Sequence, residues 1–324
     1  MKLPEEEEFE WKLKEESETD WDHGERPEKR SLEERIKNGM VLVDKPKGPT
    51  SKQVSAWVKK VLNIKKAGHS GTLDPVATGV LPVALDQATK ISQALKGASK
   101  EYICLMKLNR EVSKREASEE ASRFVGKVKQ IPPELSAVKR EEREREIYYI
   151  DILETEKDLV LFKIGCERGF YVRNFCKDLG KALNTEGEMI DLRRTKVGCF
   201  KEEELNYLQD LKDELKFWKQ GKQNKLDKVI LPVEAGVRHL KKVIVKDSAV
   251  SALCHGANLG VQGISKLQES IEPGELVAIL TLKGELIAIG NSQRNSEELL
   301  EEEKGTAVDL ERVFMDKDVY PKEW

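Results

Sequence analysis

Apolar and polar residues alternate with two different periods along residues 31–235, and each period predicts one kind of element. Short apolar runs bounded by glycine, proline or charged residues predict strands at 40–43, 80–85, 100–108, 147–154 and 159–166. Apolar residues three or four positions apart predict helices on Val54, Trp57, Val58, Val61 and Leu62, on Ala117, Ala121, Phe124 and Val125, and on Val172, Phe175, Cys176, Leu179 and Leu183. A capping box of Ser113 and Glu116 would start the second helix, and Gly126 would end it. This part of the chain therefore predicts a mixed α/β domain.

The pattern of charged and apolar residues changes towards the C-terminus. Residues 201–230 are highly charged and helical in pattern, which is typical of a connector. Short apolar runs at 242–245, 276–282 and 285–290 follow, and glycine turns separate them. This order predicts a small β-barrel over residues 238–324 as a second unit, after a first unit over residues 31–235.

Residues 1–30 form an acidic extension that is poor in apolar residues, so composition predicts a flexible segment. Trp11 and Trp21 interrupt this pattern, and we expect part of the extension to dock on the C-terminal barrel. The net charge of −3 hides a strong division, because residues 1–20 carry nine acids and three bases whereas residues 41–100 carry ten lysines and three acids. A local basic patch is the electrostatic footprint of a nucleic-acid site, although lysines on a solvated face are the commoner explanation.

Composition argues against several classes of protein. No apolar run approaches the roughly 20 residues of a membrane helix, and the acidic start lacks the pattern of a signal peptide. The five cysteines are scattered without a Cys-x-x-Cys pair, which argues against a zinc site and a disulfide scaffold. We therefore expect a cytoplasmic protein with no membrane contact and no bound metal.

Candidate chemistry is concentrated in the polar loop of residues 68–79. Its first eight residues hold one histidine (His69), two hydroxyl groups and a single acid (Asp74), and its glycines permit close approach of the backbone. Taken alone, an Asp-Pro pair such as Asp74-Pro75 is most often a turn or a helix cap. The residues by themselves thus make Asp74 a candidate without deciding its role.

The loop as a whole carries a resemblance. Gly-His-Ser-Gly-Thr-Leu-Asp-Pro followed by Ala-Thr-Gly resembles the catalytic loop of the bacterial tRNA T-loop pseudouridine synthase and its archaeal and eukaryotic relatives, the dyskerin family. Three further stretches resemble other motifs of this family: residues 42–51, 169–173 and 191–198. In the second of these stretches, Phe170 replaces the threonine that is usual in the family. Four short stretches near the C-terminus resemble a PUA domain, an RNA-binding module: residues 254–259, 263–264, 273–277 and 283–285. The resemblance implies a pseudouridine synthase fold, in which helices flank a mixed, largely antiparallel sheet, followed by a small PUA barrel.

The resemblance also implies roles for individual residues. Asp74 matches the aspartate on which isomerisation of uridine depends, and Tyr102 matches a tyrosine that stacks on the flipped base. Tyr171 matches a residue that assists proton removal from C5, and Arg173 supplies the countercharge of Asp74. His69 would displace the RNA strand or fill the gap that the base leaves.

RNA contacts outside these five residues follow from the same resemblance. Lys139 and Arg140 belong to a region that forms a mobile loop over substrate RNA in the family, although the acids at 141–146 depart from its pattern. His255, Gly256 and Ala257 lie in the PUA-like stretch, where a lone histidine is otherwise most often structural. For Lys45, a side chain in the cleft and a solvent-exposed turn lysine remain open. The paired arginines at 193–194 fit either phosphate contacts or a structural ion pair.

Two subtypes of enzyme and one non-enzyme remain. The acidic extension and the PUA resemblance favour the archaeal, guide-directed type, whose implied partners are an H/ACA guide RNA, substrate rRNA or tRNA, and small accessory ribonucleoprotein subunits. The first alternative is a guide-independent tRNA T-loop synthase. The second is a catalytically inactive RNA-binding scaffold. The reaction type needs no cofactor, and the sequence contains no glycine-rich phosphate loop.

Overall fold

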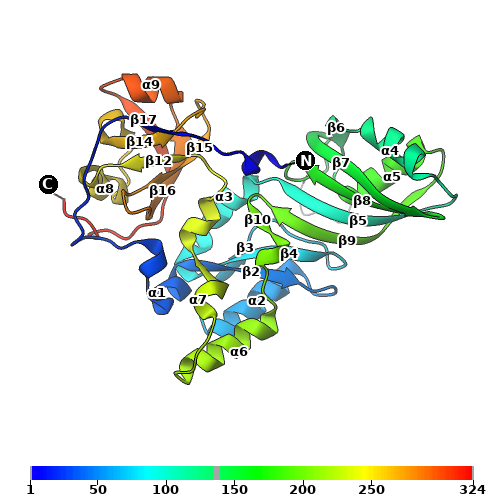
Figure 1. The fold of residues 1–324 in the computed structure, drawn as a ribbon, viewed down its shortest axis with the longest axis horizontal. Helices are drawn as coiled ribbons and strands as arrows, with labels where there is room; N and C mark the ends of the chain where they lie inside the picture. Colours follow the sequence, from blue (N-terminus) through cyan, green and yellow to red (C-terminus); the bar gives the residue numbers. More distant parts are fainter. Residues whose placement is uncertain (1, 134–138, 323–324) are drawn as a thin grey trace.

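The strands of the chain form two sheets in the computed structural model, which describes residues 2–133 and 139–322 (Figure 1). The larger sheet follows the order β11-β2-β4-β9-β5-β8-β7-β6, with β3 on β4 and β10 on β9. Among its described pairs only β4 and β9 run parallel. Its strands are β2 (Gly39–Lys45), β3 (Ala67–His69), β4 (Thr78–Leu85), β5 (Lys100–Leu108), β6 (Gly126–Gln130), β7 (Arg143–Glu156), β8 (Leu159–Cys166), β9 (Gly187–Val197), β10 (Phe200–Lys201) and β11 (Ile230–Pro232).

Helices cover this sheet in two groups, each with its own apolar core. The helices α4 and α5 pack against the even-numbered side chains of β5, such as Cys104 and Met106. The helices α2 and α6 pack against β2 and β4 through residues such as Val54 and Leu211. The α-helices of the chain are α1 (Leu32–Lys37), α2 (Ser51–Leu62), α3 (Ser92–Gly97), α4 (Lys114–Ser122), α5 (Val172–Ala182), α6 (Leu208–Lys219), α7 (Leu226–Val229), α8 (Asp247–Cys254) and α9 (Ser296–Glu301).

The predicted mixed, largely antiparallel sheet with flanking helices is confirmed, and two of the apolar residues that predicted its helices are exposed. Trp57 is 44% exposed on α2 and Val125 is 48% exposed after the end of α4. Both residues match a helical period, but a period cannot say whether a neighbouring element covers the position. The long strand β9 escaped prediction because its polar residues hide the alternation of buried and exposed positions.

The C-terminal unit is a curled sheet of order β1-β14-β12-β15-β16-β17-β13. Its core includes Val243, Ile264 and Ile287, and α8 packs on β16. A fourth apolar cluster joins the two sheets, with Met40 and Leu42 on one side and Ile244 and Ala278 on the other. Its strands are β1 (Trp11–Leu13), β12 (Lys242–Val245), β13 (Leu259–Gly260), β14 (Ile264–Gln268), β15 (Leu276–Leu280), β16 (Leu286–Ser292) and β17 (Thr306–Val313).

The acidic N-terminal extension crosses between the two sheets. Its strand β1 pairs antiparallel with β14, with Trp11 opposite Gln268. Upstream of β1, the Glu6 carboxylate accepts hydrogen bonds of 3.0 Å from the Lys196 ammonium on β9. Six 3-10 helices are described along the chain: Pro4–Glu6, Pro27–Lys29, Asp86–Ile91, Glu202–Glu204, Val233–Val237 and Val261–Gly263. No described helix is both long and apolar enough to cross a membrane.

Candidate active site

The loop that carries Asp74 connects β3 to β4 and is held by the start of α2. The Ser51 hydroxyl accepts a hydrogen bond of 2.9 Å from the backbone N–H of Leu73 and donates one to its carbonyl oxygen. At the end of the loop Gly79 has φ +101°, and a Cβ atom there would lie 2.2 Å from the Arg194 carbonyl oxygen. Only glycine fits this close approach, so Gly79 fixes the path of the backbone from the loop into β4.

The loop brings Asp74 to the start of α5. The Arg173 guanidinium donates a hydrogen bond of 2.9 Å to the Asp74 carboxylate, across 99 residues of sequence. The Arg173 side chain is 44% exposed and the Asp74 side chain is 57% exposed. The expected ion pair is therefore present, and it is open to solvent because Asp74 and Pro75 lie at the tip of a surface loop. Such a carboxylate is accessible to a large substrate.

Tyr171 lies at the N-cap position of α5, two residues before Arg173. The Gln130 side chain brackets its backbone, since the amide oxygen accepts from the Tyr171 N–H at 2.9 Å and the amide nitrogen donates to its carbonyl at 3.1 Å. Gln130 is buried at the end of β6. Gln130 was not predicted as a site residue, because no sequence pattern around it indicates this contact.

Tyr102 lies on β5 and is partly buried, and β9 places Arg194 beside it. Burial of the phenol raises the pKa of Tyr102 to about 12. The ring therefore stays neutral at physiological pH and can offer an apolar face to a base. The charge of Asp74 is close enough to act on the same phenol.

Three cations without a carboxylate partner among the described residues lie beneath the loop: Lys45, Lys100 and Arg194. Arg194 is 1% exposed, and its Nε donates to the Val80 carbonyl oxygen at 2.8 Å. A Cβ at Gly71 would meet the Arg194 Nη1 at 3.4 Å and the Lys100 Cε at 3.6 Å, so the loop passes directly over both. Burial first, and then the Arg194 charge, lower the pKa of both lysines. The floor of the loop is therefore cationic.

Both open alternatives for Lys45, a cleft-facing and a solvent-exposed side chain, are wrong. The side chain is fully buried, and its ammonium donates to the carbonyl oxygens of Pro46, Pro75 and Ala77. Lys45 thus supports the loop from below and does not offer a charge to RNA. For the paired arginines, Arg193 forms ion pairs with Asp44 and Glu202.

His69 sits at the start of the loop and is partly buried. Its Nδ1 lies 3.0 Å from the Ser55 hydroxyl of α2. Burial, and then the nearby Arg194 charge, lower the pKa of His69, so the ring is neutral near pH 7. A neutral ring suits packing against RNA better than it suits a phosphate contact.

The remaining predicted RNA contacts belong to two other connections of the chain. Lys139 and Arg140 are exposed in the connection between β6 and β7, and Lys139 forms an ion pair with Glu141. Residues 136–138 of the same predicted segment lie outside the described residues. His255, Gly256 and Ala257 form an exposed turn after α8, in the other sheet's unit.

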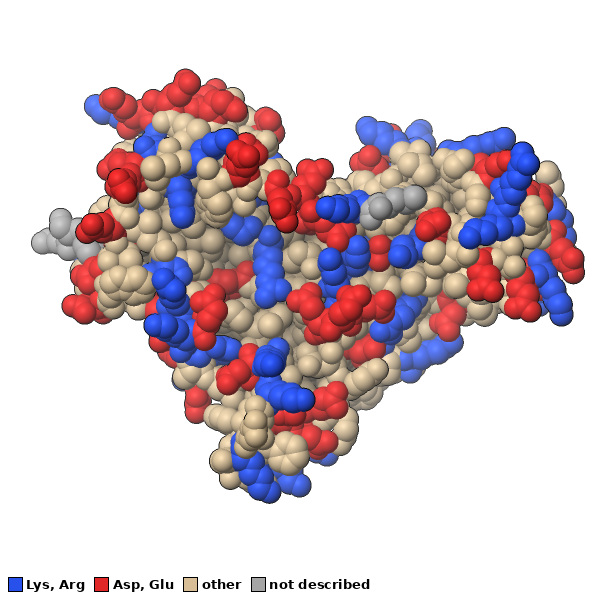
Figure 2. Space-filling view, in the orientation of Figure 1, with Lys and Arg blue, Asp and Glu red and all other residues tan. Residues whose placement is uncertain are grey.

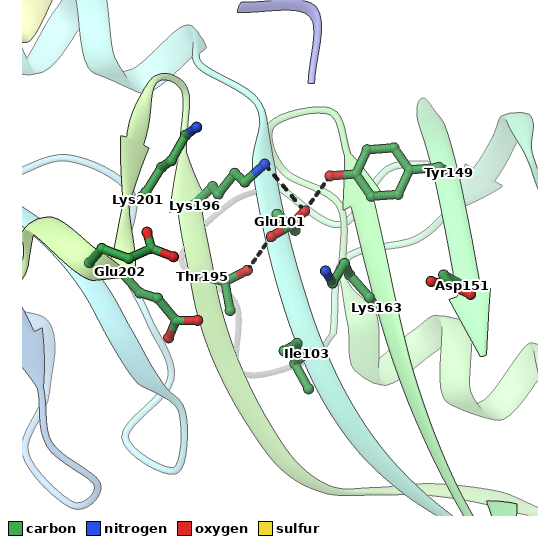
Figure 3. A pocket seen from close by; sticks show the side chains of 10 residues that line it. Glu101, Ile103, Tyr149, Asp151, Lys163, Thr195, Lys196, Lys201 and Glu202 are labelled. Carbon is green, nitrogen blue, oxygen red and sulfur yellow. Dashed lines mark hydrogen bonds and ion pairs between the residues drawn. The ribbon is translucent and has the colours of Figure 1, made fainter. Parts of the chain in front are cut away.

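A pocket of about 330 Å³ lies on the face of the larger sheet opposite to the face that carries Tyr102 (Figure 3). Glu101 is central to it and accepts hydrogen bonds from Tyr149 at 2.5 Å and Thr195 at 2.7 Å. Successive strand residues point to opposite faces, so Glu101 and Tyr102 face away from each other. None of the predicted site residues lines this pocket.

The described residues contain no group of histidine, cysteine and acid side chains that could hold a metal ion. The reactive group of the candidate site is the Asp74 carboxylate. It can attack an electrophilic carbon or stabilise a cationic sugar, as carboxylates do at glycosidic bonds. Arg173 can orient that carboxylate through its planar fork. Tyr102 and Tyr171 supply aromatic surface nearby.

Comparison with protein families matches most of the chain to known domains. Residues 59–172 match the N-terminal domain of the TruB family of pseudouridylate synthases, and residues 173–238 match the C-terminal domain of tRNA pseudouridylate synthase B. Residues 241–314 match the PUA domain, and residues 3–55 match the DKCLD domain. The fold class and the family resemblance expected from the sequence are thus confirmed.

Individual relatives are similar over nearly their full length. A probable tRNA pseudouridine synthase B of Methanocaldococcus jannaschii is 51% identical over 96% of this chain and 93% of its own length. The counterpart in Pyrococcus furiosus is 51% identical over 96% and 92%. The chain is also similar to one in a crystal structure of a Cbf5-Nop10-Gar1 complex, with a TM-score of 0.95, 50% identity and coverage of 99% and 98%.

A second solved structure is that of an H/ACA RNP bound to a substrate RNA containing 2′-deoxyuridine. The similar chain has a TM-score of 0.94 and 48% identity, and the match covers 100% of both chains. The loop with Asp74, the Arg173 ion pair and the matched domains agree with one another. The chain therefore belongs to the TruB family of pseudouridylate synthases, enzymes that isomerise uridine in RNA, and it carries a PUA and a DKCLD domain.

Proposed function

We propose that the chain is the catalytic subunit of a guide-directed H/ACA ribonucleoprotein and that Asp74 carries the isomerisation of uridine. The ion pair of 2.9 Å between Asp74 and Arg173 supports this role most directly, because it holds one accessible carboxylate at the tip of the family's loop. Full-length similarity to a chain in an RNA-bound H/ACA particle supports the guided setting. The proposed partners are a guide RNA, substrate rRNA or tRNA, and small accessory proteins.

In the proposed reaction the bond between the sugar C1′ and N1 of uracil breaks, and the base turns. A bond between C1′ and C5 then forms, C5 loses a proton and N1 gains one, so atoms balance and no electrons are exchanged. The Asp74 carboxylate attacks or stabilises the sugar, while Arg173 holds it in position. Tyr102 stacks on the extruded base, and Tyr171 assists proton removal from C5.

Three units correspond to this proposal: residues 1–30 as an extension on the PUA unit, residues 31–235 as the catalytic domain, and residues 238–324 as the PUA domain. The pairing of β1 with β14 supports the first, and the gap between β11 and β12 supports the boundary between the other two. We also propose that the protein works in the cytoplasm. All five cysteines are free thiols, which fits a reducing compartment.

The test is pseudouridine formation in a T-loop transcript and in a guide-matched target. Each RNA is incubated with the protein alone, and with guide RNA and accessory proteins. Product that requires the guide supports the proposal. Product from the protein alone identifies the guide-independent alternative, which the names of the archaeal relatives favour. Full activity of Asp74→Asn under either condition would exclude Asp74 as the catalytic group.

A further inference from the structure

The segment from Lys45 to Leu73 has an unusual balance of charge. It holds seven lysines and no aspartate or glutamate in 29 residues. Acids make up 59 of the 324 residues of the chain, so a stretch of this length would carry about five on average. Most of this segment is α2 and the turn that follows it.

The lysines of α2 share its outer side with an aromatic residue. Val54, Val58 and Leu62 point into the core, so Lys52, Trp57, Lys59 and Lys60 are left exposed. We call these four exposed residues the α2 face. Lys52 and Lys60 are eight residues apart, which corresponds to about 12 Å along a helix. Lys65 and Lys66 extend the same positive charge past the end of α2.

None of these five lysines takes part in an ion pair within the part of the chain that the structure describes. Lysines elsewhere are often neutralised; on β6, for example, Lys127 pairs with Glu144 and Lys129 pairs with Glu142. On the side of the molecule that Figure 2 shows, basic and acidic side chains are interleaved over much of the surface, and acids gather over α9. The α2 face therefore presents positive charge that the protein itself leaves uncompensated.

The α2 helix is also the element that holds the catalytic loop. Ser51 is hydrogen-bonded to Leu73, and Ser55 lies 3.0 Å from the His69 ring. Thr50 caps the helix, and its N-terminus lies beside the loop that carries Asp74. An RNA strand that delivers a uridine to Asp74 consequently runs close to this helix.

We propose that the α2 face is a docking surface for the phosphate backbone that flanks the target uridine. This inference rests on the proposed function, since it assumes that the uridine enters at Asp74. Lysine ammonium groups act as point charges and read no sequence, which suits an enzyme whose target is chosen by a guide. Trp57 packs against the sugar or the base between the phosphates.

The test compares RNA binding of full-length variants over a range of salt concentrations. The α2 variant combines Lys52→Gln, Lys59→Gln and Lys60→Gln. The control variant combines Lys212→Gln, Lys216→Gln and Lys219→Gln on α6, where exposed lysines are interspersed with acids. Both variants lose three positive charges, so the control isolates the position of the charge from its amount. Circular dichroism and thermal unfolding verify that both variants fold.

Loss of three phosphate contacts should reduce the slope of log K against log salt by about 2, because each contact to a single strand contributes roughly 0.7. If the binding curves of the α2 variant and the wild type converge near 1 M salt, the dissociation constant of the α2 variant at 0.1 M should rise on the order of 100-fold, and that of the control less than about twofold. Trp57→Ala should weaken binding and leave the salt slope unchanged, because Trp57 carries no charge. Equal effects of the two lysine variants would overturn the proposal.

Product formation separates this inference from the proposed function. At saturating RNA the α2 variant should form pseudouridine at a rate within about threefold of the wild type, because its residues bind the backbone and do not touch the reacting atoms. An inactive wild-type protein would contradict the proposed function, whereas an active protein whose α2 variant binds RNA normally would contradict only the docking surface. Normal RNA binding with loss of an accessory protein would assign the α2 face to a protein partner and overturn the proposal.

Discussion

Replacing Lys100 with methionine should make the protein more stable near neutral pH. Lys100 begins β5 and is 5% exposed, and its ammonium donates a hydrogen bond to the Ala98 carbonyl oxygen. Burial, and then the neighbouring Arg194 charge, lower the pKa of this lysine from 10.5 to about 8. Methionine fills a similar volume without a charge.

The size of the effect follows from the shift of that pKa. A difference of about 2.5 units at 1.36 kcal/mol per unit corresponds to about 3.4 kcal/mol. Because the folded-state pKa of Lys100 lies below the unfolded value, the unfolded chain binds more protons between pH 8 and 10.5. The contribution of Lys100 to the free energy of unfolding thus rises with pH across this window. Below pH 8 the buried ammonium is charged and lowers the free energy of unfolding by the full amount. Loss of the hydrogen bond to Ala98 costs about 1 kcal/mol, so the net gain below pH 8 is about 2 kcal/mol.

The assay is chemical denaturation of the wild type and Lys100→Met at several pH values from 7 to 10.5. The difference between the two proteins cancels most other titrating groups. It should fall from about 2 kcal/mol in favour of the variant to about 1 kcal/mol in favour of the wild type. Lys96→Met, at an exposed lysine on α3, is the matched control and should change the free energy of unfolding at pH 7 by less than about 0.5 kcal/mol. A Lys100→Met difference that is constant with pH, or a destabilisation at pH 7, would refute the reasoning.

Four further substitutions test the site. Asp74→Asn should lower single-turnover product formation by at least about 10³-fold and leave the RNA dissociation constant nearly unchanged. Arg173→Lys should lower kcat by about 10²-fold because lysine lacks the planar fork, and a near wild-type kcat would contradict the pairing. Gln130→Ala should lower kcat about tenfold by releasing the Tyr171 backbone, with RNA binding as the control. Gly79→Ala should cost about 2–3 kcal/mol in urea unfolding, because its Cβ would lie 2.2 Å from the Arg194 carbonyl oxygen.

Long-range pairing explains most differences between the predicted and the observed structure. The strands with clear apolar runs, such as β5 and β8, were predicted to within a few residues because their periodicity is local. The strand β1 was not predicted. It has only three residues, which show no clear alternation and no flanking glycine turns, and they form a strand only by pairing with β14. Trp57 predicted a helix by its spacing, but only the packing of the tertiary structure decided that its side chain is exposed.

The candidate site shows the same division. The loop motif identified Asp74, and the Gly-Phe-Tyr-Val-Arg stretch identified Arg173, but their ion pair joins residues 99 positions apart. Lys45 belongs to a motif, yet its burial beneath Pro75 and Ala77 became clear only from the paired strands β2 and β4. The exposure of the Asp74–Arg173 pair likewise depends on how far the loop projects from the sheet.

The sequence by itself determined the family, the order of the units and the identity of the acid at position 74, because these are properties of residue order and local spacing. Only the tertiary structure decided which charges meet, which are buried and which are left facing solvent. Those outcomes depend on the register of strands far apart in the chain, such as β4 on β9, and on the packing of helices over the sheet. Electrostatic energy varies with distance and burial in three dimensions, so a linear sequence leaves it undetermined.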